Sequence, residues 1–224
     1  MELTKEQCRE IIARRIAQEL KDGDVISLGI GLPTEVANYI PKGLQVYFQS
    51  ENGMIGGGER DFDAPGNAHV TNAGGIPVKT RPGAVFFDTL TSFAIIRGGH
   101  VNTTVLGALQ VDSHGNLANW MIPGAFVPGM GGAMDLTVGA KKVIVAMEHM
   151  TNKGEPRIVQ DCTLPLTAAH EVDMIVTERC VIDVVPEGLK LKEINPNFTL
   201  EEVLSSTGAK LIVPEELGKG YARL

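Results

Sequence analysis

The fold is indicated first by one stretch, Val25-Ile26-Ser27-Leu28-Gly29-Ile30-Gly31-Leu32-Pro33-Thr34. Its first four residues form a short apolar run, which predicts a buried strand. Pro33 suits the first turn of a helix, where its missing N–H costs no hydrogen bond. Gly29 and Gly31 lie between the two elements and carry no side chain, so a ligand can approach the backbone there. The stretch therefore predicts a strand, a tight binding turn and a helix.

The same alternation of short apolar runs and helical patterns continues on both sides of this stretch. Thr4 and Gln7 form a predicted capping box for an N-terminal helix. Further strands are predicted at residues 46–49, 85–87, 103–111, 142–147, 174–177 and 181–185, and helices at residues 34–39, 89–97 and from 199 onward. This alternation predicts an α/β fold, with residues 1–224 forming a single open domain that has a largely parallel central sheet flanked by helices. Residues 52–75, rich in Gly and Asp, predict loops around a site.

Composition narrows the classes of protein. The 224 residues are 43% hydrophobic and 21% charged, which is typical of a globular protein with a sizeable core. The net charge of −7 argues against nucleic-acid binding, and no apolar run is long enough to predict a membrane span. Three cysteines without a Cys-x-x-Cys pair, and no secretory signal, favour the cytoplasm. The five histidines lack metal-ligand spacing, so no metal is expected.

Glu51 is the first candidate for chemistry. It follows an apolar strand, lies between Ser50 and Asn52-Gly53, and precedes the glycines of residues 56–58. Carboxylates are common at strand ends, but glycine surroundings let a bulky acyl group reach this one. A second glycine-rich segment, residues 128–136, could direct backbone N–H groups at a developing oxyanion. Its alternative interpretation is a turn that leads into a helix.

Two other functions fit the same residues. Gly29-x-Gly31 is similar to the start of a dinucleotide-binding fingerprint, although Thr34 replaces the third glycine. The acidic residue that such a site needs about 20 positions later is present as Glu51. A nucleotide- or NAD-binding oxidoreductase is therefore one alternative, and a non-catalytic binding subunit is the other.

Several of these motifs together resemble a known family, the β subunits of the family I 3-oxoacid CoA-transferases. The resemblance rests on Ser50-Glu51-Asn52-Gly53, residues 28–33, residues 131–136, Asn72-Ala73-Gly74-Gly75, residues 92–100 and Asn116-Leu117-Ala118-Asn119-Trp120. It extends from the first predicted helix through Thr177.

The resemblance implies a ping-pong transfer of CoA between carboxylic acids. Glu51 matches the family's nucleophile, which forms a mixed anhydride and then a glutamyl-CoA thioester. Gly131 or Gly132 matches the loop glycine whose N–H contributes to the oxyanion hole. Ser27, Gly29, Gly31, Asn52 and Gly53 are the expected substrate- and CoA-binding residues.

The family also implies that a separate α subunit completes the enzyme, as a heterodimer or an α2β2 heterotetramer. CoA is then a substrate, and no cofactor is expected. Acetoacetate with acetate or butyrate is the first expectation for the acids, and succinate or a branched 3-oxoacid is the alternative.

The sequence departs from the family pattern at two places, and the proposed chemistry also requires an ionised Glu51. Residues 56–58 lead to Glu59-Arg60 where many relatives have Gly-x-Gly-Pro, and Ser27 stands where some relatives have Asn. Glu51 must be ionised to attack, so its pKa should stay below about 7 despite partial burial. Amide donors from Asn52 or the glycine loops are expected to keep it charged.

Overall fold

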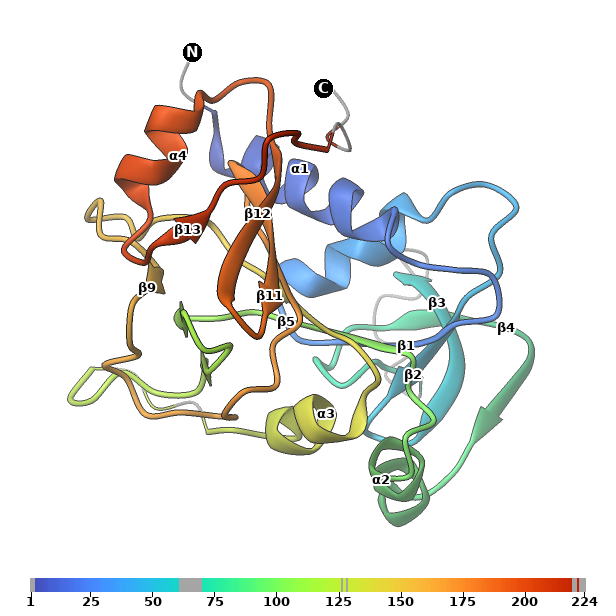
Figure 1. The fold of residues 1–224 in the computed structure, drawn as a ribbon. Helices are drawn as coiled ribbons and strands as arrows, with labels where there is room; N and C mark the ends of the chain where they lie inside the picture. Colours follow the sequence, from blue (N-terminus) through green and yellow to red (C-terminus); the bar gives the residue numbers. More distant parts are fainter. Residues whose placement is uncertain (1–2, 61–69, 126, 128, 219–220, 222–224) are drawn as a thin grey trace.

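The computed structural model describes residues 3–60, 70–125, 127, 129–218 and 221. Within these residues a large sheet has the strand order β13-β12-β11-β10-β8-β5-β1-β2-β3-β4 (Figure 1). Its strands are β1 (Val25–Leu28), β2 (Tyr47–Ser50), β3 (Met54–Arg60), β4 (Val78–Phe86), β5 (Thr103–Leu106), β8 (Val143–Ala146), β10 (Met174–Val176), β11 (Cys180–Val185), β12 (Gly188–Ile194) and β13 (Leu211–Ile212). A small second sheet contains β7 (Leu117–Ala118), β6 (Gln110–Asp112) and β9 (Ile158–Val159).

The centre of the large sheet is parallel, as the alternating pattern predicts. Strands β2, β1, β5, β8 and β10 pair in parallel in that spatial order. Antiparallel strands extend the sheet on both sides, with β3 and β4 beyond β2, and β11 and β12 beyond β10. The fold is therefore α/β with a parallel centre and antiparallel extensions.

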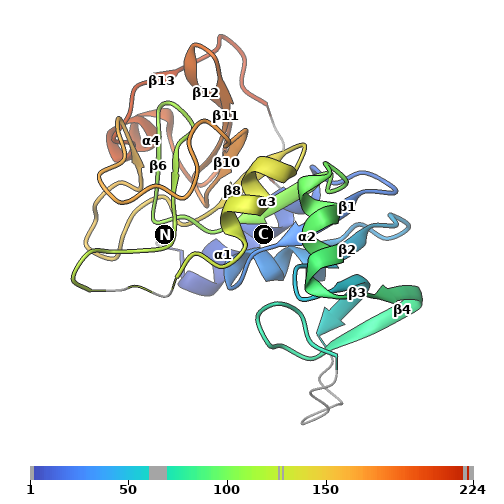
Figure 2. The same ribbon diagram turned by 90° about the horizontal axis from the view of Figure 1, so that it is seen from below.

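Helices cover both faces of this sheet. They are α1 (Lys5–Ala17), the 3₁₀ helix η1 (Leu32–Tyr39), α2 (Thr89–Arg97), α3 (Ala133–Gly139) and α4 (Leu200–Ser206). Because successive side chains of a strand point to opposite faces, Ile144 of β8 packs with Ile12 of α1 on one face, and Val145 packs with Ile96 and Leu136 on the other. Figure 2 shows α2 and α3, which contact each other, lying side by side. The two helix layers thus bury two separate apolar clusters.

Several predicted elements are confirmed by the structure. The capping box of Thr4 and Gln7 is present at the start of α1. Strand β1 and helix α2 have the predicted bounds, and Thr199 caps α4. The helices carry strong local signals in their capping residues, and β1 is a short apolar run.

Two predictions about elements are wrong, and a third is confirmed with a different helix type. Residues 54–60, expected to be loop, form β3, and the remainder of the expected loop includes residues 61–69, which lie outside the described residues. The run 103–111 is divided between β5 and β6, in two different sheets. The predicted helix after Gly31 is present and ends at Tyr39 as predicted, but it is a 3₁₀ helix, in which the Thr34 N–H donates to the Gly31 carbonyl at 3.2 Å.

Candidate active site

The candidate site is a cavity of about 510 Å³ at the carboxyl ends of parallel strands. Glu51 follows β2, Gly29 follows β1 and Gly107 follows β5, so three neighbouring strands open into the same space. In open α/β sheets, ligands bind at this edge, where the connections leave the strands. The predicted site residues that line the cavity are Ser27, Gly29, Glu51, Gly131 and Gly132.

The glycine loop before α3 lies directly against the Glu51 carboxylate. A Cβ atom placed on Gly132 would lie 2.0 Å from Glu51 Oε2, and one placed on Gly131 would lie 3.9 Å from Oε1. No side chain fits at position 132 without displacing the carboxylate. The two segments that the resemblance joins are therefore in contact, although some 80 residues separate them in the chain.

The environment raises the pKa of Glu51 above its ordinary value. Partial burial is the main cause, because it disfavours the charged form. The negative charge of Asp135 raises the pKa further, and the backbone N–H of Gly132 opposes both effects. Asp135 is itself paired with Arg97 at 2.6 Å, which limits its influence. The ionised form of Glu51 is thus less stable, relative to its protonated form, than that of an exposed glutamate.

Three predicted binding residues do not line this cavity. The Asn52 side chain is directed elsewhere, since its Nδ2 donates to the Thr71 carbonyl at 2.9 Å. The Gly132 N–H, and not Asn52, is therefore the amide beside the carboxylate. Gly53 is buried in the turn behind Glu51, and Gly31 lines a neighbouring cavity.

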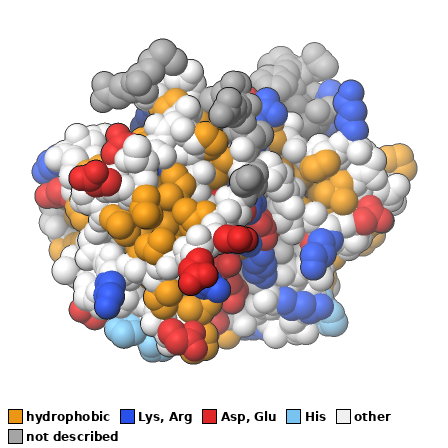
Figure 3. Space-filling model, turned by 45° about the horizontal axis from the view of Figure 1, so that its top comes forward, with side chains coloured by type: hydrophobic (Ala, Val, Ile, Leu, Met, Phe, Trp, Pro, Cys, Tyr) orange, Lys and Arg blue, Asp and Glu red, His pale blue; other side chains and the backbone are white. Residues whose placement is uncertain are grey.

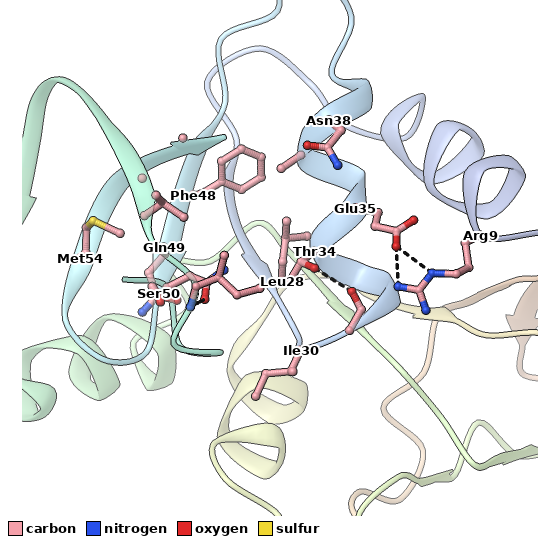
Figure 4. A pocket seen from close by; sticks show the side chains of 17 residues that line it. Arg9, Leu28, Ile30, Thr34, Glu35, Asn38, Phe48, Gln49, Ser50 and Met54 are labelled. Atoms are coloured by element: carbon pink, nitrogen blue, oxygen red, sulfur yellow. Dashed lines mark hydrogen bonds and ion pairs between the residues drawn. The ribbon is translucent and has the colours of Figure 1, made fainter. Parts of the chain in front are cut away.

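That neighbouring cavity, of about 490 Å³, lies between η1 and the strands β2 and β3 (Figure 4). Leu28, Ile30 and Ser50 line both cavities. Arg9 and Glu35 form an ion pair at its side, with Arg9 Nε donating to Glu35 Oε1 at 2.7 Å. The arginine charge is therefore already compensated within the chain.

Asn119 is a cavity residue that was not predicted to belong to the site. Its Nδ2 donates to the Gly107 carbonyl at 3.1 Å, and its Oδ1 accepts from Thr167 Oγ1 at 2.6 Å. Both contacts fix the side chain at the wall of the cavity. The signal that could have found it is its place in the motif of residues 116–120, which is one of the motifs that carry the resemblance.

Two other kinds of site are absent from the described part of the chain. It contains no group of three or more His, Cys, Asp and Glu side chains placed to hold a metal ion. None of its helices combines the length and the apolar character that a membrane span requires. On the face seen in Figure 3, acidic and basic side chains are interspersed around hydrophobic patches.

Comparison with known proteins decides the family. Residues 9–206 match the family model described as Coenzyme A transferase. The chain belongs to the coenzyme A transferase family. It is 52% identical over 209 residues to the beta subunit of the acetate CoA-transferase of Haemophilus influenzae, covering 93% of each chain. It is 45% identical to the B subunit of the succinyl-CoA:3-ketoacid coenzyme A transferase of Helicobacter pylori, covering 92% of this chain and 99% of the relative.

A solved structure has the same fold as this CoA-transferase chain. It is the acyl-CoA transferase apoenzyme from Escherichia coli O157:H7, with a TM-score of 0.76 and 22% sequence identity. The match covers 97% of this chain and 44% of that longer chain. Family membership favours a CoA-transferase over the dinucleotide-binding alternative, since the Gly29-x-Gly31 turn is part of the matched region.

Proposed function

We propose that this chain is the β subunit of a CoA-transferase that moves CoA from an acyl-CoA to a short-chain carboxylate by a ping-pong mechanism. Glu51 is the nucleophile and carries CoA as a glutamyl thioester between the two half-reactions. The observation that carries the proposal is the contact between the Glu51 carboxylate and the Gly131-Gly132 backbone inside a cavity at the carboxyl ends of parallel strands.

The chemistry needs a carboxylate that can attack and be attacked. A Glu51 oxygen attacks the thioester carbonyl, the C–S bond breaks, and CoA leaves as a thiolate, giving a mixed anhydride. The thiolate then attacks the glutamyl carbonyl and expels the first acid as a carboxylate. The second acid reverses both steps, so atoms and charge balance without a cofactor.

The surroundings of Glu51 support both roles. Partial burial weakens the hydration of the carboxylate and raises its pKa, and a less solvated oxygen is a better nucleophile. The adjacent Gly132 N–H points to the place where negative charge develops when the glutamyl carbonyl is attacked. Exclusion of water from the cavity would also protect the thioester from hydrolysis.

A separate α subunit completes the proposed enzyme. The relatives are named as the beta or B subunits of their enzymes, and this chain spans nearly their whole length. For the acids, the relatives' names favour acetate, with succinate and a 3-ketoacid as the alternative pair. We infer that acetoacetate is exchanged with acetate or butyrate.

Mass spectrometry of the assembled complex tests the nucleophile. The complex is incubated with acetoacetyl-CoA, acetyl-CoA, butyryl-CoA or succinyl-CoA without an acceptor acid. We expect the β chain to gain the mass of a CoA thioester on the peptide that contains Glu51. Glu51→Gln should show no adduct and lose at least about 10⁴-fold in transfer rate, because the covalent route is removed.

The matched control is Glu155→Gln, which makes the same change at an exposed carboxylate and should transfer CoA at the wild-type rate. An active Glu51→Gln complex would favour the non-catalytic binding subunit instead. Tight NADH binding by the wild-type complex would favour the oxidoreductase.

A further inference from the structure

The turn that carries Glu51 is held by two buried residues, Gly53 and Ser92, that do not line its cavity. The Gly53 N–H donates to the Ser50 carbonyl at 2.9 Å, which closes a turn with Glu51 and Asn52 at its centre. The Ser50 carbonyl also accepts a hydrogen bond from Ser92 Oγ, at 3.2 Å. Because this carbonyl belongs to the peptide group that joins Ser50 to Glu51, its direction sets where the Glu51 side chain begins.

The direction of the Ser92 hydroxyl is fixed in turn by Gln49. Gln49 Nε2 donates to Ser92 Oγ at 2.8 Å. A hydroxyl has one proton, so a Ser92 that accepts from Gln49 has its proton available for the Ser50 carbonyl. Ser92 is fully buried and Gln49 is 2% exposed, so the hydrogen bond between these two side chains is shielded from water. Figure 4 shows Gln49 beside Ser50.

The next residue of α2 reaches the other half of the site. A Cβ atom on Gly132 would lie 3.2 Å from Phe93 Cζ, so the Phe93 ring supports the glycine loop from behind. Consecutive residues of one helix thus contact the nucleophile turn and the glycine loop. Helix α2 is itself fixed at its start, where the Asp88 side chain accepts from the Thr91 N–H.

We propose that Ser92, oriented by Gln49, is a positioning residue for Glu51: it fixes the peptide before the nucleophile so that the carboxylate stays against the glycine loop. The inference rests on the proposed function of Glu51. A displacement of about 1 Å of a reacting group can lower a rate about 100-fold. Ser92→Ala removes the donor to the Ser50 carbonyl and lowers the rate of CoA loading by at least about tenfold.

The experiment measures single-turnover loading of CoA onto the β chain of the assembled complex, with acetoacetyl-CoA as donor. Ser92→Ala lowers the maximal loading rate and leaves the half-saturating donor concentration within about twofold, since no substrate contact is lost. The matched control is Ser206→Ala on α4. It removes a buried hydroxyl that donates to the Glu202 carbonyl at 2.7 Å, and Figure 1 shows α4 far from α2.

Gln49 supplies a second variant with a different readout. The introduced carboxylate of Gln49→Glu cannot donate to Ser92, so the Ser92 proton turns toward it and leaves the Ser50 carbonyl. Its protonated form can donate again. The loading rate of Gln49→Glu relative to wild type therefore rises as the pH falls. Gln49→Met added to Ser92→Ala lowers the rate no further, because Gln49 acts through Ser92.

The outcomes separate this inference from the proposed function. A Ser92→Ala loading rate within about threefold of the Ser206→Ala rate overturns the positioning role, as does a loss confined to the half-saturating concentration. If Ser92→Ala does not assemble, a pH-independent ratio for Gln49→Glu overturns it instead. A Glu51→Gln complex that still loads CoA contradicts the proposed function itself.

Discussion

At the scale of single residues, the proposed role of Glu51 requires an ionised carboxylate, but its surroundings disfavour the ionised form. Burial and the charge of Asp135 raise its pKa, while only the ionised form can attack a thioester. The folded-state pKa is raised, so ionisation of Glu51 destabilises the fold as pH rises through that pKa. A destabilising carboxylate of this kind is consistent with the proposed role of Glu51, because reactive groups are often kept at a cost in stability.

The acid limb of the pH–rate profile should report this pKa. We expect transfer to fall as pH drops through the Glu51 pKa, because the proposed nucleophile becomes protonated. Asp135→Asn removes a negative charge that disfavours the carboxylate and leaves the positive charge of Arg97 uncompensated, so both effects lower the Glu51 pKa. We expect the acid limb to move to lower pH. Asp161→Asn makes the same change at a side chain that is 76% exposed, and it should leave the limb in place. An upward shift in Asp135→Asn would contradict the assignment.

At the scale of elements, α1 is anchored to β12 by a buried ion pair. Arg15 Nε and Nη2 each donate to a Glu193 oxygen at 2.6 Å, and both side chains are at most 7% exposed. Burial would raise the pKa of Glu19, but hydrogen bonds from Lys142 and Arg15 outweigh it and lower the pKa to about 2. The contribution of Glu19 to stability is therefore present above its ordinary pKa near 4.5 and is lost as pH falls toward 2.

Removal of one partner from the buried Arg15–Glu193 ion pair should lower the stability of the fold. Glu193→Gln leaves the Arg15 charge buried without its main partner, so we expect the free energy of unfolding to fall by about 3 kcal/mol. Glu10→Gln is the control on the same helix, because its pair with Arg14 is exposed and should contribute about 0.5 kcal/mol or less. Urea denaturation of the two variants measures the difference. Equal decreases in the free energy of unfolding would show that burial does not determine how much these ion pairs contribute to stability.

The elements also show what local sequence signals can and cannot predict. Helix α2 and strand β1 could be predicted with correct bounds because the helical pattern of one and the apolar run of the other are local in the sequence. Strand β3 was missed because Gly56, Gly57 and Gly58 have low β-propensity. A Cβ on Gly56 would lie 2.9 Å from Ala84 Cα, so this glycine permits the close approach of β4. That reason depends on a neighbour about 30 residues away, which local sequence does not reveal.

The candidate site was predictable in part. Glu51 and the glycine loop could be paired through the resemblance, and the structure places them in contact. The positions of Asn52 and Gly53 could not be predicted, because their partners, Thr71 and Phe87, come from segments whose packing is set by the tertiary fold. Nothing in the local sequence distinguishes Ser92 and Gln49 from other polar residues. Only the hydrogen bond between their side chains indicates a role.

At the scale of the whole molecule, the helices that hold the site also expose large apolar side chains. Leu90 of α2 is 80% exposed, and Val138 of α3 is 69% exposed. Ile30, at the mouth of both cavities, is also 69% exposed. Exposed apolar side chains around a site are typical of a protein–protein interface. We propose that the α subunit covers them.

Charges introduced on these helices should therefore weaken assembly. Leu90→Asp combined with Val138→Asp would bury two unpaired carboxylates against the α subunit, so we expect the Kd of the complex to rise at least about 100-fold. Analytical ultracentrifugation of the mixed subunits measures this. Leu204→Asp, which places a charge at a 40% exposed position on α4, is the control and should assemble normally. Normal assembly of the double variant would place the α subunit on another face.

The Gly53 backbone has a consequence for how this chain can diverge. Gly53 has a φ of +115°, and any Cβ there would lie 2.0 Å from the Phe87 oxygen. A positive φ and the nearby Phe87 oxygen thus restrict the residue type two positions after Glu51. Every substitution at this codon would have to rebuild the start of α2 as well. Descendants of this chain that retain the turn are therefore confined to glycine there, whatever acids they come to exchange.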